Sequence, residues 1–391
     1  IRRPPRSTLF PYTTLFRSLY DNGEYNEGAA FVFHGSPSGL GSSAGWMADG
    51  GQESAEFGYA VSMAGDLNGD GFCDVIVGAR FYDGSLPDEG RVFVYFGSGT
   101  GVTGAPVILE GSGQDYSYFG NSVSYAGDVN GDGYGDIVAG EPSYSNGQIA
   151  EGRVYVFHGS ASGIETSPSW VYESDLSIVS LGASVSTAGD VNGDGYADIV
   201  TGMVGYTNGE TYEGRALVFH GSQSGLSLTP DWADEGDQAY AYFGISATTA
   251  GDVNGDGYSD VIVGAYYYDD GEADEGVAFV YHGGASGLSS TPDWTGQCDQ
   301  GSARFGESVS TAGDVNGDGY CDVIVGAPYY SNGETNEGRA VLYLGGASGI
   351  DVSPAWTKEG DQEYGIFGRS LCAAGDVNGD GYGDIVIGMI E

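Results

Sequence analysis

The sequence predicts an all-β fold, a β-propeller of four-stranded blades, and three observations carry this prediction. A 62-residue unit recurs without insertions, and its short β-rich runs are separated by glycine-rich turns. Glycine accounts for 72 of the 391 residues and tyrosine for 29, a composition that favours strands and tight turns over helices. Six copies of the unit are present in this fragment, and a seventh blade in the full protein is the alternative.

The most regular part of the unit first appears as AGDLNGDGFCDVIVG, starting at Ala64. An alternating run such as SVSTAG precedes it, and a turn such as SNGETNEG follows it. Next come a third strand such as GRAVLYLG and a fourth stretch that ends near a tryptophan. Four short strands per unit match a propeller blade, whereas a β-solenoid needs shorter repeats and a parallel βαβ array needs helices.

This period divides the chain into five whole blades and two halves. The whole blades are 57–118, 119–180, 181–242, 243–304 and 305–366. Residues 19–56 supply only strands three and four, and residues 367–391 supply only strands one and two. These halves either close a six-bladed ring by strand exchange or belong to a ring whose seventh blade is lost, and we favour a truncated chain.

Residues 1–18 do not belong to the repeat. They carry four of the twelve basic residues and no Asp, Glu or Gly. No apolar stretch follows the arginines, so the segment is not a signal peptide. We interpret it as a non-native, adapter-like segment and exclude it from the fold. The chain also contains no run of about 18 apolar residues, so we expect no membrane insertion of this fragment.

The charge excludes two classes of partner. The formal net charge is −43, from 55 acidic and 12 basic residues, so nucleic acid and anionic membrane surfaces would repel the chain. The four cysteines form no CxxC pair and leave the redox compartment open.

Most of the other rare residues follow the same period, which favours structural roles. We expect the histidines at the end of the third strand to be packing residues, because Phe96 and Leu344 take that place in two copies. We expect the tryptophans near the fourth strand to be wedges between blades. A glutamate before a glycine in every unit either braces the hairpin turn or binds a ligand at the rim. These residues are His34, His158, His220 and His282; Trp46, Trp170, Trp232, Trp294 and Trp356; and Glu27, Glu89, Glu151, Glu213, Glu275 and Glu337.

The acidic loop DxNxDGxxD is the one constellation with specific chemistry. It places oxygen side chains at positions 1, 3, 5 and 9 and a glycine at position 6, and oxygen donors in this pattern suit calcium. An ion-free Asx-rich turn is the alternative, but unneutralised carboxylates in six copies would repel one another. The predicted metal ligands, with the position-7 residue contributing its backbone carbonyl, are Asp66, Asn68, Asp70, Phe72 and Asp74; Asp128, Asn130, Asp132, Tyr134 and Asp136; Asp190, Asn192, Asp194, Tyr196 and Asp198; Asp252, Asn254, Asp256, Tyr258 and Asp260; Asp314, Asn316, Asp318, Tyr320 and Asp322; and Asp376, Asn378, Asp380, Tyr382 and Asp384.

The position of the last acidic ligand distinguishes this loop from an EF-hand, which has its closing carboxylate at position 12 and continues into a helix. Here position 12 is apolar or Thr and lies in a predicted strand, so the ninth residue closes the loop. About six calcium ions are expected. Weak sites of this kind fill only where calcium is abundant, which predicts an extracellular or cell-surface location.

Three motifs at fixed spacing resemble the FG-GAP repeat of the integrin α-subunit propeller. They are FG before the first strand, as at Phe119-Gly120, the acidic loop, and GAP after the second strand at Gly326-Ala327-Pro328. The resemblance covers residues 19–391. The third unit departs from it with Leu181-Gly182, and GAP becomes GAR, GEP, GMV, GAY or GMI in other units.

The resemblance implies calcium in the loops between first and second strands, and a protein or glycan ligand on the opposite face. That face would carry segments such as Tyr240-Ala241-Tyr242 and Tyr268-Asp269-Asp270, although the sequence does not define the ligand-binding residues. The expected function is an adhesion or ligand-binding module that is not an enzyme.

The sequence leaves two other hypotheses about function open. One is a non-catalytic propeller attached to a lost hydrolase or lyase domain, and the other is a passive surface module. Catalysis requires a base and nucleophile set that breaks the repeat. The residues that do break it form no such set; they are chiefly Cys298, Arg304, Lys358 and Arg369.

Overall fold

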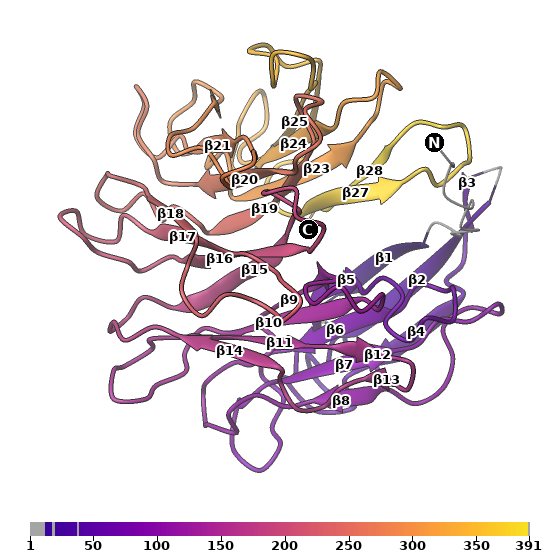
Figure 1. The fold of residues 1–391 in the computed structure, drawn as a ribbon. Helices are drawn as coiled ribbons and strands as arrows, with labels where there is room; N and C mark the ends of the chain where they lie inside the picture. Colours follow the sequence, from indigo (N-terminus) through magenta and orange to yellow (C-terminus); the bar gives the residue numbers. More distant parts are fainter. Residues whose placement is uncertain (1–11, 18–19, 37–38, 390–391) are drawn as a thin grey trace.

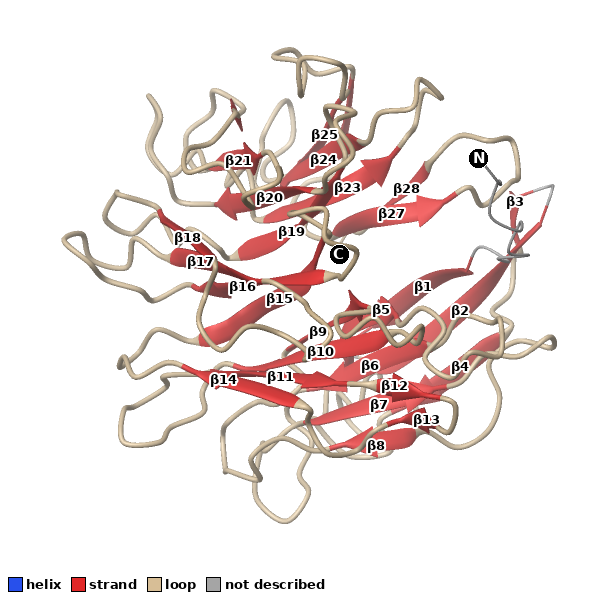
Figure 2. Cartoon of the chain, in the orientation of Figure 1, coloured by secondary structure: helices blue, strands red, loops and turns tan. Residues whose placement is uncertain are grey.

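A computed structural model describes residues 12–17, 20–36 and 39–389. The described chain consists of strands, turns and bends without a helix, so the predicted all-β class is confirmed (Figure 2). Six four-stranded sheets and two two-stranded sheets account for its strands. This part of the chain accordingly contains no helix of the length and apolar character needed to span a bilayer.

Five of these sheets are the predicted whole blades. In the first two blades the strands are β5 (Phe57–Met63), β6 (Val75–Ala79), β7 (Arg91–Tyr95) and β8 (Val107–Leu109), then β9 (Ser122–Gly127), β10 (Asp136–Glu141), β11 (Arg153–Phe157) and β14 (Trp170–Glu173). In the next three they are β15 (Leu181–Gly189), β16 (Asp198–Met203), β17 (Arg215–Phe219) and β18 (Trp232–Glu235); β19 (Ser246–Gly251), β20 (Asp260–Ala265), β21 (Val277–Tyr281) and β22 (Trp294–Gly296); and β23 (Ser308–Gly313), β24 (Asp322–Ala327), β25 (Arg339–Tyr343) and β26 (Trp356–Glu359).

The two ends of the chain form incomplete blades. At the N-terminal end β2 (Ala29–Ser36) pairs with β1 (Tyr12–Arg17), β3 (Gly39–Leu40) and β4 (Trp46–Asp49). At the C-terminal end β27 (Leu371–Gly375) pairs with β28 (Asp384–Ile387). The remaining pair, β12 (Gly159–Ser160) and β13 (Gly163–Ile164), is a short hairpin beside one blade.

The two incomplete blades do not share a sheet. In whole blades the second strand pairs with the third, as β24 does with β25, and strand exchange would pair β28 with β2 in the same way. That edge of β2 is paired with β1, from Tyr12 opposite His34 to Arg17 opposite Ala29. The segment set apart in the sequence therefore supplies a strand over residues 12–17, while residues 1–11 and 18 lie outside the described residues. Its non-native origin stays a prediction.

The sheets follow one another around a common centre, from indigo to yellow in Figure 1. First strands of successive blades lie next to each other, as β9, β15, β19 and β23 do. A parallel bridge also joins neighbouring blades at five of the six junctions in the described chain, for example between Gly90 and Phe119. These features confirm the predicted β-propeller.

Burial explains why the strands differ in sequence. The second strand of a whole blade, such as DVIVGA in β20, is buried at every position because neighbouring blades cover both of its faces. The first strand, such as SATTAG in β19, alternates between buried and partly exposed residues. Valine, isoleucine and alanine therefore fill the space between blades, and hydroxyl groups of neighbouring first strands pair with one another, as Ser186 does with Thr248.

Antiparallel pairing fixes which loops meet at each end of the blades. The loops between strands one and two and between strands three and four emerge at one end, and we name this end the acidic-loop rim. The hairpins between strands two and three and the connections from strand four to the next blade emerge at the other end, which we name the hairpin rim. Any feature repeated in each blade therefore recurs around one rim of the ring.

Candidate functional site

The six acidic loops lie together on the acidic-loop rim. In the blade 119–180 the loop connects β9 to β10 and runs from Asp128 to Asp136. The carboxylate of Asp128 is positioned by backbone N–H groups: Oδ1 accepts from Gly131 (2.7 Å) and Asp132 (3.1 Å), and Oδ2 accepts from Gly133 (2.8 Å). The same three bonds recur in the loops that begin at Asp66, Asp190, Asp252, Asp314 and Asp376.

The middle ligands of the loop form consecutive Asx turns. Asn130 Oδ1 accepts from the backbone N–H of Asp132 at 2.9 Å, and Asp132 Oδ1 accepts from the N–H of Tyr134 at 3.0 Å. Glycine is required between them, since Gly133 has φ +92°, a conformation that side-chain-bearing residues rarely adopt. The repeated Asn, Asp and Gly thus fix the turn before any ligand is considered.

The ninth residue is the buried anchor of each loop. Both oxygens of Asp136 are engaged, Oδ2 by the N–H of Val129 (2.9 Å) and Oδ1 by the N–H of Gly159 (3.0 Å). Burial raises the pKa of Asp136 to about 7, although the two N–H donors oppose the rise. Asp198 has the same arrangement and a pKa of about 7 for the same reason. A cation in the loop would lower these pKa values, because it stabilises the ionised carboxylate.

Neighbouring loops are connected into a continuous rim. The carbonyl oxygen of Asp128 accepts from the N–H of Ala197 in the next loop at 3.0 Å, and four other loop pairs make the equivalent bond. The ring of Tyr196 lies against Gly131 of the preceding loop, where a Cβ atom would come within 2.5 Å of it. Each loop is therefore held in place partly by contacts with its neighbours.

The donor set of each loop fits a hard cation. Three carboxylates, one amide oxygen and one backbone carbonyl are all oxygen donors, which is the ligand chemistry that calcium prefers. The structure brings the predicted ligands of each repeat into one nine-residue turn, but it does not draw their three carboxylates into contact. Such tight carboxylate triads occur elsewhere among the described residues.

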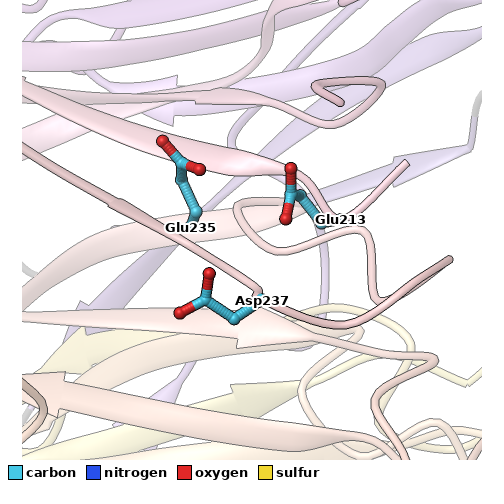
Figure 3. A group of neighbouring side chains, drawn as sticks. All are labelled: Glu213, Glu235 and Asp237. Atoms are coloured by element: carbon cyan, nitrogen blue, oxygen red, sulfur yellow. The ribbon is translucent and has the colours of Figure 1, made fainter. Parts of the chain in front are cut away.

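These tight groups lie on the hairpin rim, and the sequence reasoning missed them. Their carboxylate oxygens all lie within 4.8 Å of one another, in Glu213/Glu235/Asp237 and in Glu337/Glu359/Asp361. Figure 3 shows the first group, whose members come from the hairpin and from the end of β18. Arg215 lies 3.6 Å from Glu235 and offsets part of the charge. The recurrence of all three acids two periods apart is the signal that would have revealed the groups.

The repeated glutamate has the bracing role that was one of its two predicted roles. Glu213 is buried, and its carboxylate accepts a short hydrogen bond from the backbone N–H of Asn208 within the hairpin. Glu27, Glu151, Glu275 and Glu337 accept the equivalent bond from the residue five positions earlier, and Glu89 accepts from Ser85 N–H instead.

Four of the five tryptophans pack between blades as predicted, and Trp356 is the exception. Trp170 Nε1 donates to the carbonyl of Ser227 in the next blade at 3.0 Å, and its ring lies edge-on to Phe219. Trp232 and Trp294 bond to the following blade in the same way. Trp46 is edge-on to Tyr95. Trp356, in the last whole blade, is 39% exposed.

The histidines pack as expected. The rings of His220 and His282 lie against Gly287 and Gly349 in the next blade, and His158 approaches Gly225. His34 lies against Gly45 and Gly101.

The two segments predicted for the ligand face are only partly available at the surface. Tyr240 is 54% exposed, whereas Ala241 is buried and Tyr242 stacks on Tyr212. Tyr268 packs against the core beside Phe279. In this segment only Asp269 and Asp270 are exposed. The aromatic residues of this rim are therefore partly structural.

Comparison with known families identifies the repeat. A model of the FG-GAP repeat matches residues 57–95, 243–281, 305–343 and 367–388, and a model of an FG-GAP-like repeat matches residues 128–201. Together they cover more than half of the chain. The chain belongs to the FG-GAP repeat family.

Curated relatives of this FG-GAP protein include integrin α-subunits. Integrin alpha-5 of Xenopus laevis is 35% identical over 189 residues, a match that covers 46% of this chain and 17% of the relative. Integrin alpha-7 of Homo sapiens is 37% identical over 164 residues, covering 41% of this chain and 13% of the relative. The chain therefore matches less than a fifth of the length of either relative.

Solved structures are more distant from this FG-GAP chain. The crystal structure of BBS1N in complex with ARL6DN, soaked with lead, is 13% identical, covers 90% of this chain and 86% of that one, and has a TM-score of 0.44. A Bacillus licheniformis rhamnogalacturonan lyase is also 13% identical, covers 98% and 75%, and has a TM-score of 0.37.

Close packing between blades explains the two glycines of the FG-GAP motif. The glycine of GEP in one blade, Gly140, lies directly against the glycine that follows Leu181 in the next blade. A Cβ atom on Gly140 would come within 2.0 Å of the carbonyl oxygen of Gly182. The same approach recurs between Gly202 and Gly244.

Proposed function

We propose that this FG-GAP propeller is an extracellular, calcium-stabilised module that binds a protein or glycan ligand through its hairpin rim and serves adhesion. The observation that carries the proposal is the set of six identical all-oxygen loops, each held in a defined turn by backbone N–H groups. The named relatives are integrin α-subunits, which makes an adhesion role the natural one to test.

Calcium is the cation that these loops suit best. Calcium accepts six to eight oxygen ligands in flexible geometry, whereas magnesium demands near-ideal octahedral geometry. In each loop the first, third, fifth and ninth side chains and the position-7 carbonyl would bind the ion. Bound cations would also reduce the formal charge of −43. Affinities of about 10⁻⁴ M, typical of extracellular modules, would place the protein outside the cell.

The hairpin rim is the proposed ligand surface because its side chains vary between blades while the acidic-loop rim repeats. We further propose that the chain has no catalytic activity. Catalysis requires a base or nucleophile that breaks the repeat, and the residues that break it here, such as Arg304 and Arg369, form ion pairs with Glu307.

Calcium titration tests the proposal. Chemical unfolding of the chain in EDTA and in millimolar calcium, together with metal analysis by mass spectrometry, should show about six ions bound. Tenfold saturation of six independent sites would stabilise the fold by at most about 8 kcal/mol. Equal unfolding free energies in the two buffers, with no bound metal, would contradict the calcium role. Screening on protein and glycan arrays tests the ligand role separately.

A further inference from the structure

Glutamine side chains link neighbouring blades at the hairpin rim. Gln114 Oε1 accepts from the backbone N–H of Ser145 in the next blade, and Gln114 Nε2 donates to the carbonyl of Ser145, both at 2.9 Å. We call this pair of bonds the amide latch. It recurs between Gln52 and Asp83, Gln238 and Asp269, and Gln300 and Ser331.

One junction between whole blades lacks the latch. Between blades 119–180 and 181–242, Leu176 takes the place of the glutamine and faces Thr207. Within the described residues, the backbone N–H and C=O of Thr207 have no hydrogen-bond partner. The rest of the junction is intact, since Gly205 N–H donates to Val179 at 3.1 Å. This junction therefore keeps its fold and presents a free donor and acceptor pair.

A cavity of about 310 Å³ opens at this junction. Leu176, Ile178 and Val179 line one wall, and Gly205, Thr207 and Tyr212 line the other. The apolar wall reaches solvent, because Leu176 is 46% exposed and Ile178 is 50% exposed. Its volume is at the lower end of the range for ligand pockets, about the size for a single inserted group.

We propose that this junction is a docking site for a glutamine or asparagine side chain presented by a partner protein. The partner's carboxamide would take the place that the chain's own glutamine holds at the other junctions. A primary carboxamide carries an acceptor and a donor side by side, which matches the N–H and C=O of Thr207. The inference rests on the proposed function, since it assigns a ligand class to the same rim.

The same geometry rejects a carboxylate. A glutamate has no proton to donate to the Thr207 carbonyl, and a chain with a net charge of −43 repels it. The apolar wall formed by Leu176 and Ile178 would pack against aliphatic side chains beside the carboxamide. The site should therefore select glutamine over glutamate within an apolar peptide context.

Peptide binding to two variants tests the docking site. The probe is the blocked peptide acetyl-Ser-Leu-Gln-Leu-Ser-amide, with the same peptide carrying Glu in place of Gln as its control, and calorimetry measures both. The unmodified chain should bind the Gln peptide at least tenfold more tightly than the Glu peptide. Leu176→Gln should weaken binding of the Gln peptide at least tenfold, because the introduced side-chain amide would itself hydrogen-bond to the backbone N–H and C=O of Thr207. Leu228→Gln, which alters an 80% exposed leucine on the acidic-loop rim, should leave binding unchanged.

Two results would overturn the inference: equal or undetectable binding of the Gln and Glu peptides, or undiminished binding by Leu176→Gln. Calcium-dependent unfolding of the same proteins separates this result from the proposed function. If Leu176→Gln weakens peptide binding but calcium does not stabilise the chain, the calcium role is contradicted and the docking site is supported. Calcium-dependent stability and array binding with no effect of Leu176→Gln would remove the docking site alone.

Discussion

The two rims of the propeller are built from the same repeat but differ in what is held constant. On the acidic-loop rim, Asp, Asn and Gly recur at the same loop positions in all six units and make the same backbone hydrogen bonds. On the hairpin rim the buried glutamate recurs, while the side chains around it change. A constant rim indicates a structural requirement of every blade, and a variable rim leaves room for recognition.

The largest effect is expected at the buried anchor of an acidic loop. Asp198→Ala leaves the N–H groups of Val191 and Gly221 without their acceptors, and each buried N–H costs about 1 to 3 kcal/mol. We expect a loss of about 4 kcal/mol in the free energy of unfolding, measured with urea in EDTA. Asp384→Ala is the matched control, since Asp384 is half-buried and accepts only from Val377 in the loop. It should cost about 1 kcal/mol. Equal losses would show that the loop anchor is not what stabilises a blade.

A smaller effect is expected at the constant residue of the hairpin rim. Glu213→Ala removes the acceptor for Asn208 N–H from a buried position, and we expect about 2 kcal/mol of destabilisation. Glu213→Gln keeps an acceptor oxygen and removes repulsion from Glu235 and Asp237, so its effect should stay below about 0.5 kcal/mol. Urea unfolding compares the two variants. A large loss in Glu213→Gln would mean that the carboxylate charge matters, as it would for a bound cation.

The repeat made the architecture predictable from the sequence. A fixed period with four strand patterns is sufficient to define a blade, because each blade buries its faces against its neighbours. The wedge role of Trp170 was predicted correctly for the same reason: residues that recur at one place in every blade meet the same surroundings. The bracing role of Glu213 was one of two roles that the sequence left open. The ends of the chain were less predictable, because the pairing of β1 with β2 involves residues 12–17, which follow no repeat.

The features that the sequence did not reveal depend on side-chain geometry between blades. Spacing placed the loop ligands in one turn, but it did not show that Asp136 is buried with both oxygens hydrogen-bonded. The segment Tyr268-Asp269-Asp270 was expected on the ligand face, but Tyr268 packs inward, and the acidic group around Asp237 was overlooked. The sequence analysis also did not use the replacement of a repeated glutamine by Leu176, because its significance depends on the contact partner, Thr207, which lies in the next blade.

The smallest effect is expected at the amide latch, where the variable and constant parts of the hairpin rim meet. Gln114→Leu removes two partly buried hydrogen bonds to Ser145, and Leu176→Gln can form the equivalent pair with Thr207. We expect opposite changes of about 1 kcal/mol in the free energy of unfolding, a loss for the first and a gain for the second. Thermal unfolding in saturating calcium measures both changes without interference from the loops. If Leu176→Gln destabilises the chain, Leu176 itself stabilises this junction by packing. The variation between blades at the hairpin rim would then have a structural cause.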